Sequence, residues 1–216
     1  MRIACLAWGS LIWKPGPLPL ASAWMNDGPR LPVELCRTCD GGELAVALSS
    51  NAPDSPTFWA LLNVQDIDIA RELLRDREQI NRERPEYVGS IPGEYEGPYG
   101  ERIRAWADHR ELDAVVWTAL PPKSRDEEGR MPSVDEAIAY LDGLEGDIRD
   151  HACNYVRQLP LEIRTPYRTA IEQRLGWMPV DQWLIPNNGQ LSSSAKHGFN
   201  TLCVPDNPGA ACYPVT

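Results

Sequence analysis

The chain has 216 residues, of which 43% are hydrophobic, and its formal net charge is −10. This length and hydrophobic content suit one domain with its own core. The acidic balance argues against a nucleic acid or an anionic membrane as partner, and no run of eighteen apolar residues offers a membrane span.

The cysteines and the first residues bear on the compartment. An apolar run over residues 3–13, followed by Ala21-Ser22-Ala23, superficially fits a secretory signal, but the break at Lys14-Pro15-Gly16-Pro17 falls well before that cleavage site. The cysteines follow no regular spacing, which favours free thiols in a reducing compartment. We therefore expect a cytoplasmic protein, with thiols at Cys5, Cys36, Cys39, Cys153, Cys203 and Cys212.

The first predicted element is a buried strand over residues 3–7, which ends in a turn at Gly9-Ser10. Glycine permits backbone angles that other residues resist, and serine bonds locally to the chain. The backbone N–H groups of Gly9, Ser10 and Leu11 could then form a small concave site for an anion or a developing oxyanion. The alternative is an ordinary turn from strand to loop.

Three more strands are predicted in succession, over residues 31–37, 43–48 and 58–64, with a hairpin at residues 39–42. Short links between them favour an antiparallel meander. Cys36 and Cys39 form a lone CxxC pair at a strand end. A thiol-redox pair of the thioredoxin kind would sit at a helix start, so two unlinked thiols are the favoured interpretation.

A helix begins after Asp66, its N-cap, and is predicted to run to about Ile80. Steps of four residues from Asp66 lead through Ala70 and Leu74 to Glu78, so Glu78 continues the apolar stripe. Burial would raise its pKa towards neutrality, as a group that accepts and returns a proton requires. The alternative is a structural glutamate paired with Arg75, Arg77 or Arg82.

The remaining chain predicts a short strand at residues 103–106, a firmer strand at 113–120 and a charged loop at 121–132. A capping box at Ser133 and Glu136 starts a helix that Gly143 and Gly146 divide. Another helix starts at Thr165-Pro166 and ends at Gly176. We expect a domain over residues 1–176, and an irregular arm over 177–216 that packs on the domain or on the partner subunit of a homodimer.

Cofactors are not expected. His109, His151 and His197 lack neighbours at the spacing of metal ligands, and no glycine-rich phosphate loop follows a strand. The sequence therefore predicts no metal and no nucleotide.

Two segments resemble a known family. Ala7-Trp8-Gly9-Ser10-Leu11-Ile12-Trp13-Lys14-Pro15 is similar to the Tyr-Gly-Ser-Leu segment of the γ-glutamylcyclotransferase-like superfamily, nearest to its glutathione-specific ChaC branch. Trp8 stands where that family usually has tyrosine. Leu74-Arg75-Asp76-Arg77-Glu78 resembles the branch's Tyr-Leu-Asp-x-Arg-Glu segment, whose final glutamate is the catalytic acid/base. The resemblance covers roughly residues 3–175, and the family's His-Arg-Gly stretch is missing.

The resemblance implies an α+β fold, a small mixed or antiparallel β-barrel or curled sheet with flanking helices. It implies an enzyme that cyclises a γ-glutamyl compound to 5-oxoproline and releases the amine, without a cofactor. Glu78 would be the catalytic residue, and the substrate would be bound by Trp8, Gly9, Ser10 and Leu11. The alternative is a non-catalytic protein on the same scaffold that binds or senses a small ligand.

Overall fold

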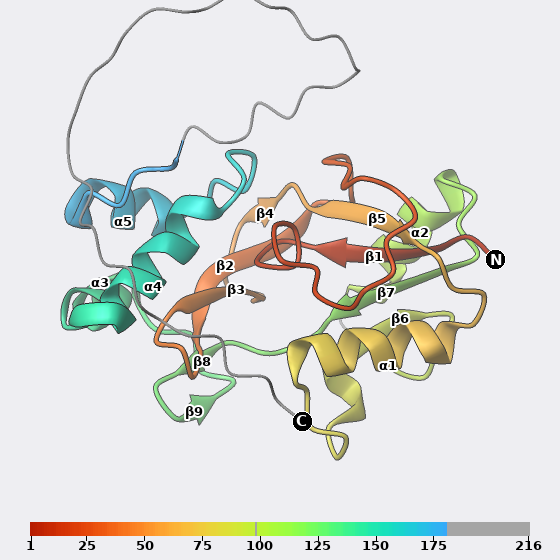
Figure 1. Ribbon diagram of the computed structural model, residues 1–216, viewed down its shortest axis with the longest axis horizontal. Coiled ribbons are helices and arrows are strands. Elements are labelled where there is room, and N and C mark those ends of the chain that lie inside the picture. The colour runs from red at the N-terminus through yellow and green to blue at the C-terminus, as the bar shows by residue number, and fades with distance from the viewer. Residues whose placement is uncertain (98, 181–216) are drawn as a thin grey trace, which may run out of the picture. The chain divides into compact units, whose positions relative to one another are not determined.

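The computed structural model describes residues 1–97 and 99–180, which form an α+β fold. Two mixed β-sheets, one of them curled into a half-barrel, are flanked within these residues by five α-helices (Figure 1). The strands are β1 (Ile3–Ala7), β2 (Leu31–Thr38), β3 (Leu44–Leu48), β4 (Asp54–Ser55), β5 (Phe58–Leu62), β6 (Val88–Ile91), β7 (Ala114–Thr118), β8 (Lys123–Ser124) and β9 (Glu127–Glu128). The helices are α1 (Ile67–Glu78), α2 (Gly100–His109), α3 (Val134–Asp142), α4 (Gly146–Gln158) and α5 (Pro166–Leu175), with a 3₁₀ turn at Pro85–Tyr87.

The first sheet has the strand order β5-β1-β7-β6. Strand β1 pairs antiparallel with β5 and parallel with β7, so Cys5 lies between Ala60 and Val116. All five residues of β1 are buried, as the apolar run predicts. The bend that follows β1 is therefore attached to a strand held on both sides.

The second sheet is built around β2, which pairs antiparallel with β3 and with the short β4. On its other side β2 pairs parallel with β8, where Arg37 is opposite Lys123. The predicted hairpin between β2 and β3 is present, closed by hydrogen bonds from the Cys39 N–H to the Glu43 carbonyl and from the Gly42 N–H to the Cys39 carbonyl.

Helix α1 covers β6 and β7 of the first sheet (Figure 1). Asp66 is its N-cap, as predicted, and accepts from the N–H groups of Asp68 at 2.8 Å and Ile69 at 3.4 Å. The buried face includes Ala70 and Leu74, and the helix ends at Glu78 because the next residue, Gln79, takes a left-handed conformation with φ of 53°.

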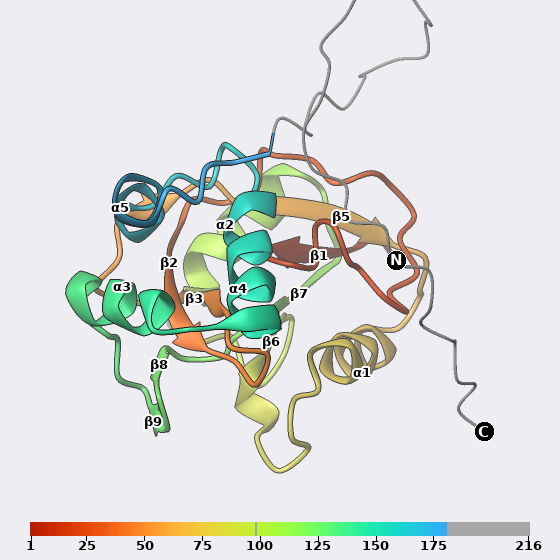
Figure 2. The ribbon, with the colours of Figure 1, turned by 60° about the vertical axis from the view of Figure 1, so that its left-hand side comes forward.

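Helices α3, α4 and α5 gather beside the second sheet, apart from α1 (Figure 2). The predicted capping box at Ser133 and Glu136 starts α3, and the chain breaks between α3 and α4 at Gly143–Gly146. Thr165 caps α5, and Gly176, with φ of 71°, ends it. Helix α5 packs on β2, so these helices cover one face of that sheet.

Three expectations were wrong, and one strand was missed. The predicted charged loop at 121–132 contains the short strands β8 and β9. Residues 103–106 belong to α2, whose buried Ile103 and Ala107 repeat at helical spacing. The strand at 58–62 does not continue a meander but pairs with β1 in the other sheet.

Strand β6 was not predicted, because turn residues at Gly93, Gly97 and Gly100 dominate the pattern of residues 84–107. Gly89 of this strand is opposite Trp117, whose indole occupies the space that a side chain would need.

The predicted arm is described only as far as residue 180. Trp177 is buried, and Arg157 of α4 donates from Nε to the Met178 carbonyl at 3.1 Å and accepts at its own carbonyl from the Val180 N–H at 3.2 Å. These residues thus pack on α4, while residues 181–216 lie outside the described part of the chain. None of the described helices has the length and apolarity needed to cross a membrane.

Candidate functional site

A cavity of about 640 Å³ lies where the bend after β1, the β2–β3 hairpin and the end of α1 meet. Strand β8, the 3₁₀ turn and helix α4 also contribute to its wall. All five residues that the sequence singled out line this cavity, namely Trp8, Gly9, Ser10, Leu11 and Glu78. The fold thus brings together two segments that are far apart in the chain.

The bend over Gly9, Ser10 and Leu11 lines the cavity and leaves backbone N–H groups without an acceptor in the described part of the chain. The Gly9 carbonyl accepts from the Ile12 N–H at 3.1 Å, and the Ser10 carbonyl accepts from the Lys14 N–H at 2.8 Å. Within the described residues, the N–H groups of Gly9, Ser10 and Leu11 donate to no protein acceptor. They are therefore available to an oxygen of a ligand.

Gly9 is required here for a reason that differs from the predicted one. Its φ is not positive, so the left-handed region is not used. A Cβ at Gly9 would instead lie 2.7 Å from the hydroxyl oxygen of Tyr155 on α4. That hydroxyl also accepts a hydrogen bond from the Val46 N–H at 3.1 Å. Tyr155 therefore ties the bend, the second sheet and α4 together at the cavity wall.

Tyr155 was not predicted as a residue of the site. Its ring packs edge-on against Trp13, with 5.4 Å between ring centroids and 68° between planes. Complete burial raises the pKa of Tyr155, so its hydroxyl stays protonated. It can then donate a hydrogen bond into the cavity while it accepts from Val46.

Glu78 is largely buried, since its side chain is only 17% exposed. Burial raises the pKa of Glu78 above its ordinary value of 4.5, against the lowering effect of Arg77. Its carboxylate lies 3.1 Å from the Arg77 guanidinium. Arg75 and Arg82, the other two expected partners, pair instead with Glu72. Glu78 is thus paired with an arginine, as the structural alternative expects, but it still lines the cavity.

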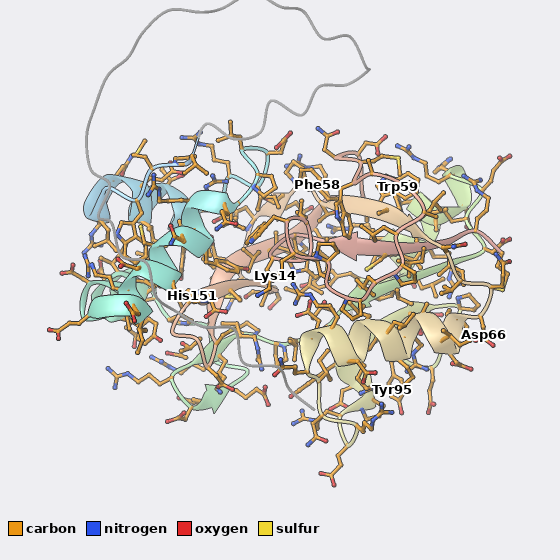
Figure 3. All side chains as sticks on the ribbon, viewed as in Figure 1. Lys14, Phe58, Trp59, Asp66, Tyr95 and His151 are labelled. Carbon is orange, nitrogen blue, oxygen red and sulfur yellow. The ribbon has the colours of Figure 1, made fainter. Side chains whose placement is uncertain are left out.

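Arg77 also holds the bend in place. It donates from Nε at 3.0 Å and from Nη2 at 2.7 Å to the Lys14 carbonyl, and from Nη2 to the Ser10 Oγ at 3.0 Å. In Figure 3, Asp66 marks the start of α1 and Lys14 lies near its opposite end. The end of α1 and the bend are therefore joined through one side chain.

Another part of the cavity wall is basic. Arg37, Arg84 and Lys123 lie there, with Glu128 between the two arginines at 3.1 and 3.5 Å. Tyr87 donates to Glu128 at 2.8 Å, and this hydrogen bond, with the help of Arg37, lowers the pKa of Glu128. Lys123 makes no ion pair with any residue of the described part. This wall therefore has positive charge left over for an anionic ligand group.

The two cysteines of the CxxC pair are free thiols. Burial raises the pKa of Cys36 and of Cys39 to about 12 each. Since the thiolate is the reactive form, neither is suited to thiol exchange near neutral pH. The structure favours the interpretation of two unlinked thiols, of which Cys39 lines the cavity.

In the described ranges, no group of three or more His, Cys, Asp or Glu side chains could hold a metal ion. Neither a comparison with protein-family models nor a search of curated proteins finds a match for this chain. The arguments for function therefore come from the cavity itself and from the two resembling segments.

Proposed function

We propose that the chain is a γ-glutamylcyclotransferase-type enzyme, which converts a γ-glutamyl compound to 5-oxoproline and a free amine. The observation that carries the proposal is that Glu78, largely buried and with a raised pKa, lines the same cavity as the bend from Gly9 to Leu11. A proton carrier and a set of oxyanion donors would then face one substrate.

The reaction is intramolecular. The α-amine nitrogen of the glutamyl group attacks the γ-carbonyl carbon, the new C–N bond closes a five-membered ring, and the bond to the leaving nitrogen breaks. Glu78 takes the proton that the attacking amine loses and returns it to the leaving nitrogen. The free N–H groups of the bend stabilise the oxyanion that forms on the carbonyl oxygen. Much of the rate would come from holding the glutamyl chain folded.

The charges of the cavity support this substrate class. A γ-glutamyl compound carries an α-carboxylate, and in a γ-glutamyl peptide a second one on the leaving part. Lys123, with Arg37 and Arg84 beside it, gives these carboxylates a basic wall. No cofactor takes part in the steps above.

A second candidate is a non-catalytic protein that binds a small ligand in the same cavity. The ion pair between Arg77 and Glu78 is the observation that favours it, because a paired carboxylate also has a purely structural use. Trp8 in place of tyrosine is a further difference from the resembling family.

The purified protein, incubated with glutathione and a panel of γ-glutamyl amino acids and amines, tests the proposal through release of 5-oxoproline. We expect turnover by the wild-type chain and a loss of about 10²–10⁴-fold in Glu78→Gln, the range that general acid–base groups contribute. Glu72→Gln, a change on the exposed side of the same helix, is the matched control. Turnover that survives Glu78→Gln unchanged would rule out the mechanism, and inactivity across the panel with a retained ligand would favour the second candidate.

A further inference from the structure

Glu43 contributes a second carboxylate to the cavity, and it has no role in the chemistry described so far. It follows directly after the hairpin glycines Gly41 and Gly42, and its side chain is 16% exposed. Its Oε2 is closed off from solvent and has no hydrogen-bond partner in the described part of the chain. A buried carboxylate oxygen in this state has lost its water without a replacement.

The nearest candidate partner is His151 on α4. Its Nε2 lies 3.3 Å from Glu43 Oε2, but the contact does not have the geometry of a hydrogen bond. The His151 side chain is 57% exposed and comes from α4 (Figure 3). The described part of the chain therefore supplies no donor to this oxygen, and the Glu43 side chain lines the cavity.

The hairpin keeps this position open. A Cβ at Gly41 would lie 2.6 Å from Glu43 Oε2 and 3.1 Å from His151 Nε2. Any side chain at Gly41 would thus displace the carboxylate. The glycine at position 41 therefore allows the Glu43 carboxylate to occupy its position in the cavity wall.

Glu43 and Glu78 act on the same neighbours. Both carboxylates contribute to the raised pKa of Cys39 and of Tyr155, which places these two side chains in electrostatic range of both. The cavity is therefore lined by two carboxylates that both act on Cys39 and Tyr155, and by the cations Arg37, Arg77, Arg84 and Lys123.

We propose that Glu43 binds the α-ammonium group of the ligand and orients it towards Glu78. This inference rests on the proposed function and adds a substrate-binding residue to it. An ammonium group has three N–H bonds. One donates to Glu43. The proton of the second passes through Glu78 to solvent, which frees the lone pair that attacks the γ-carbonyl. The third is the proton that Glu78 takes after the attack and returns to the leaving nitrogen, so that the ring keeps the N–H that faces Glu43. Glu43 itself neither gains nor loses a proton in the reaction.

The test compares two ligands that differ only in the amine. γ-Glutamylglycine carries the α-ammonium, and N-glutarylglycine is the same molecule with hydrogen in its place. Dissociation constants are measured by calorimetry in the Glu78→Gln background, where the first ligand is bound without turnover. We expect γ-glutamylglycine to bind about tenfold or more tightly than its analogue, as a charge-assisted hydrogen bond requires. Adding Glu43→Gln should bring the two affinities within about threefold of each other.

Two further variants make the comparison specific. Glu43→Asp keeps the charge one methylene further back and should retain part of the preference. Asp150→Asn removes a carboxylate from the exposed side of α4, next to His151, and should leave the preference unchanged. The inference is overturned if Glu43→Gln leaves the ratio of the two dissociation constants unchanged. An equal loss of affinity for both ligands is such a result.

The outcome is separable from that of the proposed function. Release of 5-oxoproline by the wild-type chain, with an unchanged affinity ratio in Glu43→Gln, overturns the role of Glu43 and leaves the ring closure standing. A ratio that collapses in a chain that releases no 5-oxoproline supports the role of Glu43 as an ammonium-binding residue and overturns the ring closure. Failure of the chain to bind either ligand overturns both.

Discussion

The guanidinium of Arg77 lies 3.1 Å from the carboxylate of Glu78, and the same guanidinium donates to the Lys14 carbonyl at 2.7 Å. Burial and this neighbour act on Glu78 in opposite directions, since burial raises its pKa and Arg77 lowers it. One side chain therefore sets both the charge of the glutamate and the position of the bend.

Replacing Arg77 should separate these two effects. Arg77→Met removes the lowering influence, so the pKa of Glu78 rises further and the acid limb of kcat/KM for 5-oxoproline release moves to higher pH. Arg77→Lys keeps the positive charge but not the planar guanidinium group. The acid limb of kcat/KM should therefore move less than in Arg77→Met, while the bend still loses hydrogen bonds. pH–rate profiles of the three proteins check this. An acid limb at the same pH in Arg77→Met would contradict it.

The raised pKa of Glu78 also predicts how stability changes with pH. Because the folded pKa lies above the ordinary 4.5, the folded state binds more protons than the unfolded state between the two values. The free energy of unfolding of the wild-type chain should therefore fall as the pH rises through this window. Glutamine mimics the protonated form, so Glu78→Gln should gain stability over wild type from pH 4 to pH 7.

Urea unfolding of both proteins at several pH values measures this difference. Glu72→Gln is the control, because the pKa of that exposed carboxyl is lowered by Arg75 and Arg82 and should give a difference of opposite sign. If the stability advantage of Glu78→Gln over wild type became smaller from pH 4 to pH 7, the effect of Arg77 on the pKa of Glu78 would outweigh that of burial.

The close approach of Gly9 and Tyr155 predicts a coupling between two substitutions. Gly9→Ala should cost about 1–3 kcal/mol, because the added methyl group meets the Tyr155 hydroxyl at 2.7 Å. Tyr155→Phe should cost about 1 kcal/mol, because the Val46 N–H loses its acceptor. With both changes the nearest ring atom is Cζ at 3.9 Å, so the clash is gone. The double variant should be about 1 kcal/mol more stable than the sum of the two single losses predicts. If denaturation measurements give strictly additive losses, the close contact between Gly9 and Tyr155 is contradicted.

The thiols of Cys36 and Cys39 should react slowly with alkylating agents. With pKa values of about 12, each is almost fully protonated at pH 8, and its labelling by iodoacetamide should be roughly 10³-fold slower than that of a free cysteine. Peptide mapping by mass spectrometry after native labelling measures each site, and labelling in urea gives the reference rate. Rapid native labelling of either residue would reopen the thiol-redox interpretation.

Local signals in the sequence predicted most of the elements that carry the site. The N-cap Asp66, the capping box at Ser133 and the pair Thr165-Pro166 each work through bonds within a few residues, so they could be recognised without the fold. Spacing on a helix was also enough to place Glu78 at the edge of the apolar stripe. The same reasoning failed for β6, where Gly89 is explained only by the indole of Trp117 opposite it.

The other residues of the cavity depend on pairings that no local pattern reports. Lys123 reaches the cavity because β8 pairs parallel with β2, and Tyr155 because α4 packs over the bend. Glu43 resembles an ordinary hairpin residue until its buried oxygen is seen to lack a partner. Non-local contacts decide these positions, and the sequence alone does not rank one arrangement of strands above another.

The parallel pairing of Ile3 with Ala114 has a consequence for synthesis of the chain. Strand β1 is translated well before β7, so it must wait for this neighbour, and Tyr155 follows later still. Strand β1 and the bend that follows it therefore reach their final form late in synthesis, and until then the apolar side chains of β1 lack the cover of β7.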